Sequence, residues 1–255
     1  MARTDLWTRE QTIVAFNLYC TIPFGQAHTR NPKVQEVAKL IGRTPAAVAR
    51  KLGNFGSLDP ELKSRGVKGL ENRSKLDEEI WNEFQEDWNG LSLLSTELIA
   101  KYKHETIEQV LEIKEKDLPK GVDKLRMVKT RVYQDFFRAS VFAAYENTCC
   151  ITGMKIKELQ IASHIKPWSV DEENRTNPQN GLCLNALHDK TFDKGLITIL
   201  PDYTIRISKH LDDIKDDGVI ENYFRAYNKK PIKKPHKFLP DQDFLEYHNE
   251  NIFRR

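Results

Sequence analysis

The sequence is poor in long apolar runs, in cysteine and in charge of one sign. No apolar stretch approaches the roughly 20 residues that a helix needs to cross a bilayer. The start, MARTDLWTRE, carries charge early and lacks an apolar signal core. Only four cysteines occur in 255 residues, with no C-x-x-C pair, so we expect reduced, buried thiols. These absences predict a cytoplasmic protein with no membrane partner.

The overall charge balance identifies no partner. The net charge is only +3, while 30% of residues are charged and 39% are hydrophobic, which is typical of a soluble globular protein. The length suits two modest domains or one large domain. Any signal for a nucleic-acid partner must therefore come from local patches.

The N-terminal region predicts three helices. Residues 4–21 hold a capping box in Thr8 and Gln11, and residues 33–42 place apolar side chains at helical spacing. Thr44-Pro45 then starts a third helix, after a tight turn at Gly42-Arg43. Two short helices joined in this way are typical of a helix-turn-helix.

Basic residues are concentrated in this region. Six of them, against the single acid Glu36, lie between residues 30 and 55. We expect Arg43, Arg50 and Lys51 to contact DNA phosphates, the last two from the outward face of the third helix. A plain three-helix bundle with a solvated basic face is the alternative.

Further helices are expected before the middle of the chain. An amphipathic helix is predicted over 74–89, then a break at 89–92, a charged helical segment over 93–120 and another helix over 129–146. Pro119 and Gly121 mark a linker. We therefore predict a helix-turn-helix-like DNA-binding domain at 1–90, a charged helical linker at 91–127 and a third region at 128–255. The fold class is α+β.

The stretch from Cys149 to Ile199 gathers His, Asn, Cys and Asp among apolar residues. Cys150 to Gly153 predicts a strand end and turn, and Leu159 to Ile165 alternates like a strand, with His164 near its end. A polar loop at 170–179 follows, and then a helix over 180–193 that contains His188. A hairpin is expected from 196–200 and 204–207.

The same stretch resembles the HNH endonuclease family, whose fold is a ββα-metal finger. The letters fall on His164, Asn180 and His188. The neighbours that carry the resemblance are Thr152-Gly153, Ala162-Ser163-His164-Ile165-Lys166-Pro167-Trp168, Asn177-Pro178-Gln179-Asn180-Gly181-Leu182, Leu187-His188 and Phe192-Asp193-Lys194-Gly195-Leu196. The pattern is that of the restriction-type branch, in which Arg131-x-x-Gln134-x-x-Phe137-Arg138 recurs ahead of the finger. The resemblance covers roughly residues 128–200.

The resemblance implies a metal-dependent nuclease that hydrolyses DNA phosphodiester bonds, in restriction or defence. His164 would be the general base, a role that suits a side chain whose ordinary pKa is near neutrality. Asn180 would hold the loop and the His164 strand through backbone hydrogen bonds. His188 would bind one divalent ion, Mg²⁺ or Mn²⁺.

Two departures from the family pattern affect the metal sites. Many members carry Asp or His before the base, where this chain has Ser163, a poor ligand. Asp193 would supply the missing oxygen, with Asp189 or water as alternatives. If none of them does, the metal site is weak or metal-selective. The positions that hold a structural zinc in many members are here Cys149, Thr152, Leu184 and Leu187. With one cysteine among four, no structural zinc is expected, and apolar packing by the two leucines should replace it.

Other basic residues could contact DNA. We expect phosphate contacts from Arg131, Arg138 and Lys166, although a solvated face would explain the two arginines equally well. Residues 227–237, YNKKPIKKPHK, carry five lysines and no acid. Lys233 and Lys234 there belong either to an arm that follows phosphates or to a flexible, solvated arm. The last helix, over 238–253, should pack back on the finger. We expect His248 in the core or on the surface, with a place near the site as the alternative.

The sequence therefore predicts an HNH endonuclease with DNA as its partner. The alternative is a DNA-binding regulator whose HNH finger has lost catalysis. Cutting both strands would call for two fingers, and a homodimer is the assembly that provides them.

Overall fold

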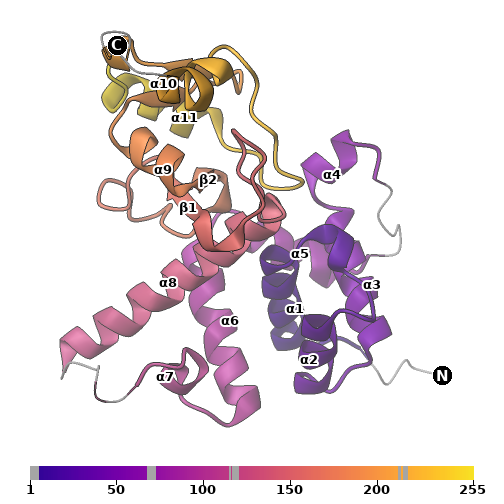
Figure 1. Ribbon diagram of the computed structural model, residues 1–255. Coiled ribbons are helices and arrows are strands. Elements are labelled where there is room, and N and C mark those ends of the chain that lie inside the picture. Colours follow the sequence, from indigo (N-terminus) through magenta and orange to yellow (C-terminus); the bar gives the residue numbers. More distant parts are fainter. Residues whose placement is uncertain (1–5, 68–72, 115, 117–120, 212–213, 215–217) are drawn as a thin grey trace. The chain divides into compact units, whose positions relative to one another are not determined.

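The computed structural model describes residues 6–67, 73–114, 116, 121–211, 214 and 218–255. The chain forms two compact units, Met1–Ala143 and Ala144–Arg255 (Figure 1). The first is helical, and the second combines small hairpins with helices, so the predicted α+β class is confirmed. Within the described ranges, no helix has the length and apolar character to cross a membrane.

The first unit consists of α-helices joined by short connections. They are α1 (Arg9–Thr21), α2 (Pro32–Leu40), α3 (Pro45–Gly56), α4 (Pro60–Ser64), α5 (Lys75–Phe84), α6 (Trp88–Lys103), α7 (Ile107–Val110) and α8 (Val122–Ala144), whose last residue lies across the unit boundary.

The helix starts follow from their capping residues. Thr8 and Gln11 form the predicted capping box of α1, and Thr44 accepts a hydrogen bond from the backbone of Ala47 before α3. The core of this unit is aromatic, since the ring of Phe16 lies 4.7 Å from that of Phe55. The three predicted N-terminal helices are present, with α2 and α3 joined by a short turn. The first begins at Arg9, whereas a start at residue 4 was predicted, and residues 4 and 5 lie outside the described residues.

The helix boundary expected at 89–92 is wrong. Asp87 caps α6 by accepting a hydrogen bond from Gly90 N at 2.8 Å, so the helix runs through these residues. Helix α6 packs against α1, although it falls mostly within the predicted linker, 91–127. The linker marker Pro119 lies outside the described residues. The functional division at residues 90 and 127 stays a prediction.

In its described residues, the second unit has two two-stranded antiparallel sheets and several helices. Its strands are β1 (Gln160–His164), β2 (Gly181–Asn185), β3 (Ile197–Ile199) and β4 (Ile205–Ile207). Strand β1 pairs with β2, with His164 opposite Gly181, and β3 pairs with β4 as the predicted hairpin. Its α-helices are α9 (Ala186–Asp193), α10 (Val219–Tyr223) and α11 (Gln242–Asn251).

Strand β2 was not expected. Residues 180–193 were predicted as one helix, but Gly181–Asn185 form a strand buried along its whole length. Full burial removes the alternation that identifies a strand, so periodicity could not separate the two. Asn185 then caps α9 by accepting from His188 N at 3.0 Å. The predicted turn is present at residues 150–152, but the strand end predicted with it is not.

The lysine-rich segment 227–237 is bound to the second unit. Lys229 N donates to Ile205 O at 2.8 Å, and Lys233 N donates to Cys150 O at 2.8 Å. Ile232 and Lys237 are buried. The segment is therefore a packed, extended chain, and the solvated flexible arm is excluded.

Candidate active site

A hollow of about 340 Å³ in the second unit brings together polar residues from β1, α9 and α11. Its polar lining is Ser163, His164, Asp189, Asp193 and His248. Its apolar walls include Trp168 and Ile252. Helix α9 packs against both strands of the β1–β2 pair (Figure 1).

His164 has a defined tautomer. Its Nε2 atom lies 2.9 Å from the carbonyl oxygen of Arg175, which only accepts, so Nε2 carries the proton. The lone pair of the neutral ring is then on Nδ1, the nitrogen that can take up a proton. Burial lowers the pKa of His164, and the bond to Arg175 opposes this in part. The ring is therefore neutral at pH 7.

Asn180 joins the loop to the strand that carries His164. Its Oδ1 accepts from Lys166 N at 2.8 Å, and its Nδ2 donates to Lys166 O at 3.1 Å. The Asn180 carbonyl also accepts from Ile165 N at 2.9 Å. Three bonds thus fix the backbone directly after His164, and Asn180 itself is 1% exposed.

His188 does not line the hollow. Its ring is 1% exposed, and both nitrogens have partners within the protein. Nε2 lies 2.7 Å from Tyr223 O, and Nδ1 lies 3.1 Å from Asn185 Oδ1. Burial lowers the pKa of His188. The structure thus brings His164 together with Asp193 but does not bring His188 to them.

Two carboxylates of α9 face the hollow instead. Asp189 and Asp193 are four residues apart and so lie on one side of the helix. Burial raises the pKa of Asp189, and burial together with the Asp189 charge raises that of Asp193. Two carboxylates that repel each other in a partly buried hollow favour an added positive charge.

The hydroxyl of Ser163 lies beside this carboxylate pair. Ser163 is 3% exposed, and its Oγ makes no hydrogen bond of ordinary geometry. It lies close enough to Asp189 to offset part of the rise that burial causes in the pKa of that carboxyl. A buried oxygen without a good partner is costly. The carboxylate oxygens of Asp189 and Asp193 are of the kind that Mg²⁺ and Mn²⁺ prefer, so these two residues could hold a hard divalent ion, with the poorer Ser163 ligand beside them.

No ready-made cage for a metal occurs in the ranges that the structure describes: no group of three or more His, Cys, Asp or Glu is arranged to hold an ion. At the zinc positions, Leu184 is fully buried, whereas Leu187 is 43% exposed. The expected apolar packing is therefore correct for Leu184 and wrong for Leu187.

The comparison with known families matches this part of the chain. Residues 149–200 match a family model described as HNH endonuclease. These residues are an HNH endonuclease domain. HNH nucleases typically use a divalent metal and act on nucleic acid. No curated protein matches the chain. His248 and Ile252, which also line the hollow, lie beyond the matched segment.

Two residues expected to contact DNA have partners inside the first unit. Arg43 donates to Gln11 and to the Leu6 carbonyl. The expectation that Lys51 points outward is wrong, because it is 4% exposed and pairs with the fully buried Asp77. A buried carboxylate requires such a counter-charge.

The other basic candidates are more accessible. Arg50 and Arg138 are exposed, as are Lys233 and Lys234. Lys166 is half-buried and pairs with Asp171 at 2.9 Å.

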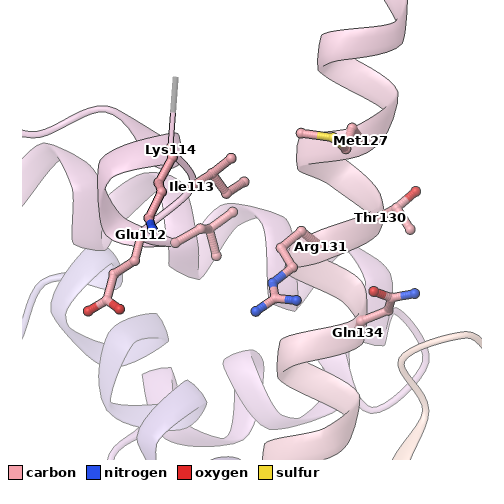
Figure 2. A pocket seen from close by; sticks show the side chains of 8 residues that line it. Glu112, Ile113, Lys114, Met127, Thr130, Arg131 and Gln134 are labelled. Carbon is pink, nitrogen blue, oxygen red and sulfur yellow. The ribbon is translucent and has the colours of Figure 1, made fainter. Parts of the chain in front are cut away.

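Arg131 lies on α8, beside a hollow of about 410 Å³ in the first unit. Figure 2 shows its side chain extending from α8 toward the segment that carries Glu112. Arg131 also pairs with Asp135 at 3.0 Å, one turn along the helix.

Sequence reasoning gave too little weight to two residues of the site. Asp189 could have been found from its four-residue spacing to Asp193, which places both on one helix face. His248 is more than 80 positions from His164, and no local pattern connects them.

Proposed function

We propose that the chain is a metal-dependent endonuclease that hydrolyses DNA phosphodiester bonds. The observation that carries the proposal is the shared hollow of His164, Asp189 and Asp193 within a segment that matches the HNH family. A role in restriction or defence against foreign DNA rests on the resemblance alone.

His164 is the proposed general base. A water oxygen forms a bond to the phosphorus, one ester P–O bond breaks, and the proton of that water passes to Nδ1 of His164. The Arg175 carbonyl supports this role, because it holds the proton on Nε2 and leaves Nδ1 to accept. Asn180 is proposed to act through position, since it fixes the backbone beside His164.

Asp189 and Asp193 are the proposed metal-holding residues, with the Ser163 hydroxyl beside them. When bound, a Mg²⁺ or Mn²⁺ ion would supply positive charge to the scissile phosphate and the leaving oxygen. His188, the ligand that the resemblance implied, is proposed to be structural. It ties α9 to Tyr223 with the 2.7 Å contact of Nε2.

DNA contact is proposed for the exposed cations Arg50, Arg138, Lys233 and Lys234. They differ from Arg43 and Lys51 in being exposed at the surface. Lys166 is half-buried and Arg131 is exposed, but each is paired with a carboxylate. To bind DNA, each would have to exchange that carboxylate for a phosphate. A homodimer stays a proposal that rests on the need to cut two strands.

One observation favours the alternative, a DNA-binding regulator with an inactive finger. The histidine that the resemblance makes a metal ligand donates from Nε2 to the Tyr223 carbonyl, and its Nδ1 lies 3.1 Å from Asn185 Oδ1. On the regulator hypothesis, the chain binds DNA but cuts none.

Cleavage of supercoiled plasmid separates the two functions. Purified full-length chain is incubated with modified and unmodified plasmid in Mg²⁺, in Mn²⁺ and in a chelator. The nuclease proposal expects nicked or linear product with metal and none with the chelator. Binding without any cutting, on both plasmids and with both metals, would support the regulator.

A further inference from the structure

We propose that His248, on the C-terminal helix α11, is a positioning residue for the carboxylates of the nuclease site. The inference rests on the proposed function, because it concerns the metal-holding residues Asp189 and Asp193. His248 lies well outside the matched segment 149–200. It nevertheless lines the same hollow as His164 and is 1% exposed.

The His248 ring hydrogen-bonds to one residue of α9, Phe192, and to one residue of β3, Thr198. Its Nε2 lies 3.1 Å from Phe192 O, and its Nδ1 lies 2.8 Å from Thr198 Oγ1. A carbonyl only accepts, so Nε2 donates to Phe192, and the neutral ring then accepts the Thr198 hydroxyl proton at Nδ1. One side chain thus satisfies a helix carbonyl and a strand hydroxyl at once.

The carbonyl that His248 binds belongs to the residue directly before Asp193. The last carbonyls of a helix have no partner within it, so this turn of α9 depends on outside donors. Phe192 O accepts from Gly195 N at 2.8 Å and from His248 Nε2, the donor that comes from outside the α9 segment. The imidazole also stacks on the Phe192 ring, with centroids 3.6 Å apart and planes 12° apart. These contacts fix the peptide from which the Asp193 carboxylate extends.

The rest of α11 is anchored so that His248 cannot drift. Asp241 N donates to Gln179 O at 3.1 Å at one end, and Arg254 N donates to Gly195 O at 2.9 Å beyond the other. Gly195 has φ +67°, and a Cβ there would lie 2.0 Å from Ile252 O. The segments around Gly195 and Ile252 are therefore closer together than any residue other than glycine would allow. The C-terminal helix is therefore part of the site and not an appendage.

A direct test measures Mn²⁺ binding to the full-length chain without DNA, by the electron paramagnetic resonance signal of free Mn²⁺. The variants are His248→Phe, which keeps a stacking ring but no hydrogen bond, and His248→Gln, whose amide can again donate to Phe192 O. Thr198→Val removes only the second tie. Leu245→Ala is the matched control, because Leu245 is fully buried one turn away on α11 and its side chain has no group that can hydrogen-bond to the Phe192 carbonyl.

We expect wild type and Leu245→Ala to bind Mn²⁺ equally once the folded fraction is matched, and Asp193→Asn to lose binding. His248→Phe should weaken binding about tenfold or more, as residues that orient metal ligands do, and His248→Gln should recover part of the loss. Equal affinity of His248→Phe and wild type would overturn the positioning role while leaving the metal site intact. If wild type itself binds no Mn²⁺, or if Asp193→Asn binds as well as wild type, the metal site fails and this inference fails with it.

Discussion

The Nε2 atom of His164 lies 2.9 Å from the carbonyl oxygen of Arg175, eleven residues along the chain. This contact makes Nδ1 the proton-accepting nitrogen of the ring. It also ties β1 to the loop that Asn180 closes, so the position and the protonation of His164 come from the same local structure. The loop is therefore part of the proposed catalytic apparatus.

Stability should fall in mild acid because of His248. Burial lowers its pKa to about 4, whereas an unfolded histidine titrates near 6.5. Between these values the unfolded chain binds the extra proton, so the free energy of unfolding decreases as pH falls, by roughly 3 kcal/mol in total. Urea unfolding of wild type and His248→Gln from pH 7.5 to 4.5 measures the effect. The variant should show a shallower decrease, and identical pH profiles would contradict the assignment.

Asp193→Asn should raise stability in the presence of a chelator. The carboxylate is partly buried beside Asp189, and removing one of two like charges relieves their repulsion. The melting temperature of the variant should therefore exceed that of wild type without metal. Added Mn²⁺ should raise the wild-type value and leave the variant unchanged. A variant that melts below wild type in the chelator would argue against a strained carboxylate pair.

Gly195→Ala should be strongly destabilising. The alanine would carry a Cβ at φ +67° and 2.0 Å from Ile252 O, so both backbone strain and a clash with backbone arise. We expect a loss of more than about 2 kcal/mol in urea unfolding. Gly42→Ala is the matched control, since Gly42 has φ +68° with open space around it, and it should lose only about 1 kcal/mol. Similar losses at both positions would show that the close approach of Ile252 to Gly195 adds nothing to the cost of the substitution.

Substitutions at Lys51 and at Arg50 should affect different properties, the first stability and the second DNA binding. Lys51→Met breaks the buried pair with Asp77 and should cost about 3–5 kcal/mol in unfolding free energy. Arg50→Ala removes an exposed cation and should change stability by less than about 0.5 kcal/mol. If α3 contacts phosphate, Arg50→Ala should also reduce the slope of log affinity against log salt by about one. An unchanged slope would leave α3 as a scaffold.

Much of the fold followed from local chemistry. Capping at Thr8 and Thr44 identified two helix starts, and the β3–β4 hairpin followed from its apolar strands. Strand β2 did not, because full burial hides the alternation of its side chains.

In the site, too, features that depend on local contacts were predicted, and features that depend on distant partners were not. His164 and Asn180 were predicted from their neighbours in sequence, and their contacts are local, within 14 residues or fewer. The direction in which His188 points and the burial of Lys51 depend on distant partners, Tyr223 and Asp77. Neither partner has a sequence signal, since one contributes a backbone carbonyl and the other is an aspartate in a capping box.

The role of His164 as general base is tested by the rate at which the His164→Ala variant cuts plasmid. Plasmid cutting in Mg²⁺ and Mn²⁺ and DNA affinity are determined on the same preparations of variant and wild type. We expect wild type to cut, the variant to cut at least about a hundredfold more slowly, and both to bind DNA with equal affinity. Cutting by the variant at the wild-type rate would show that His164 is not the general base.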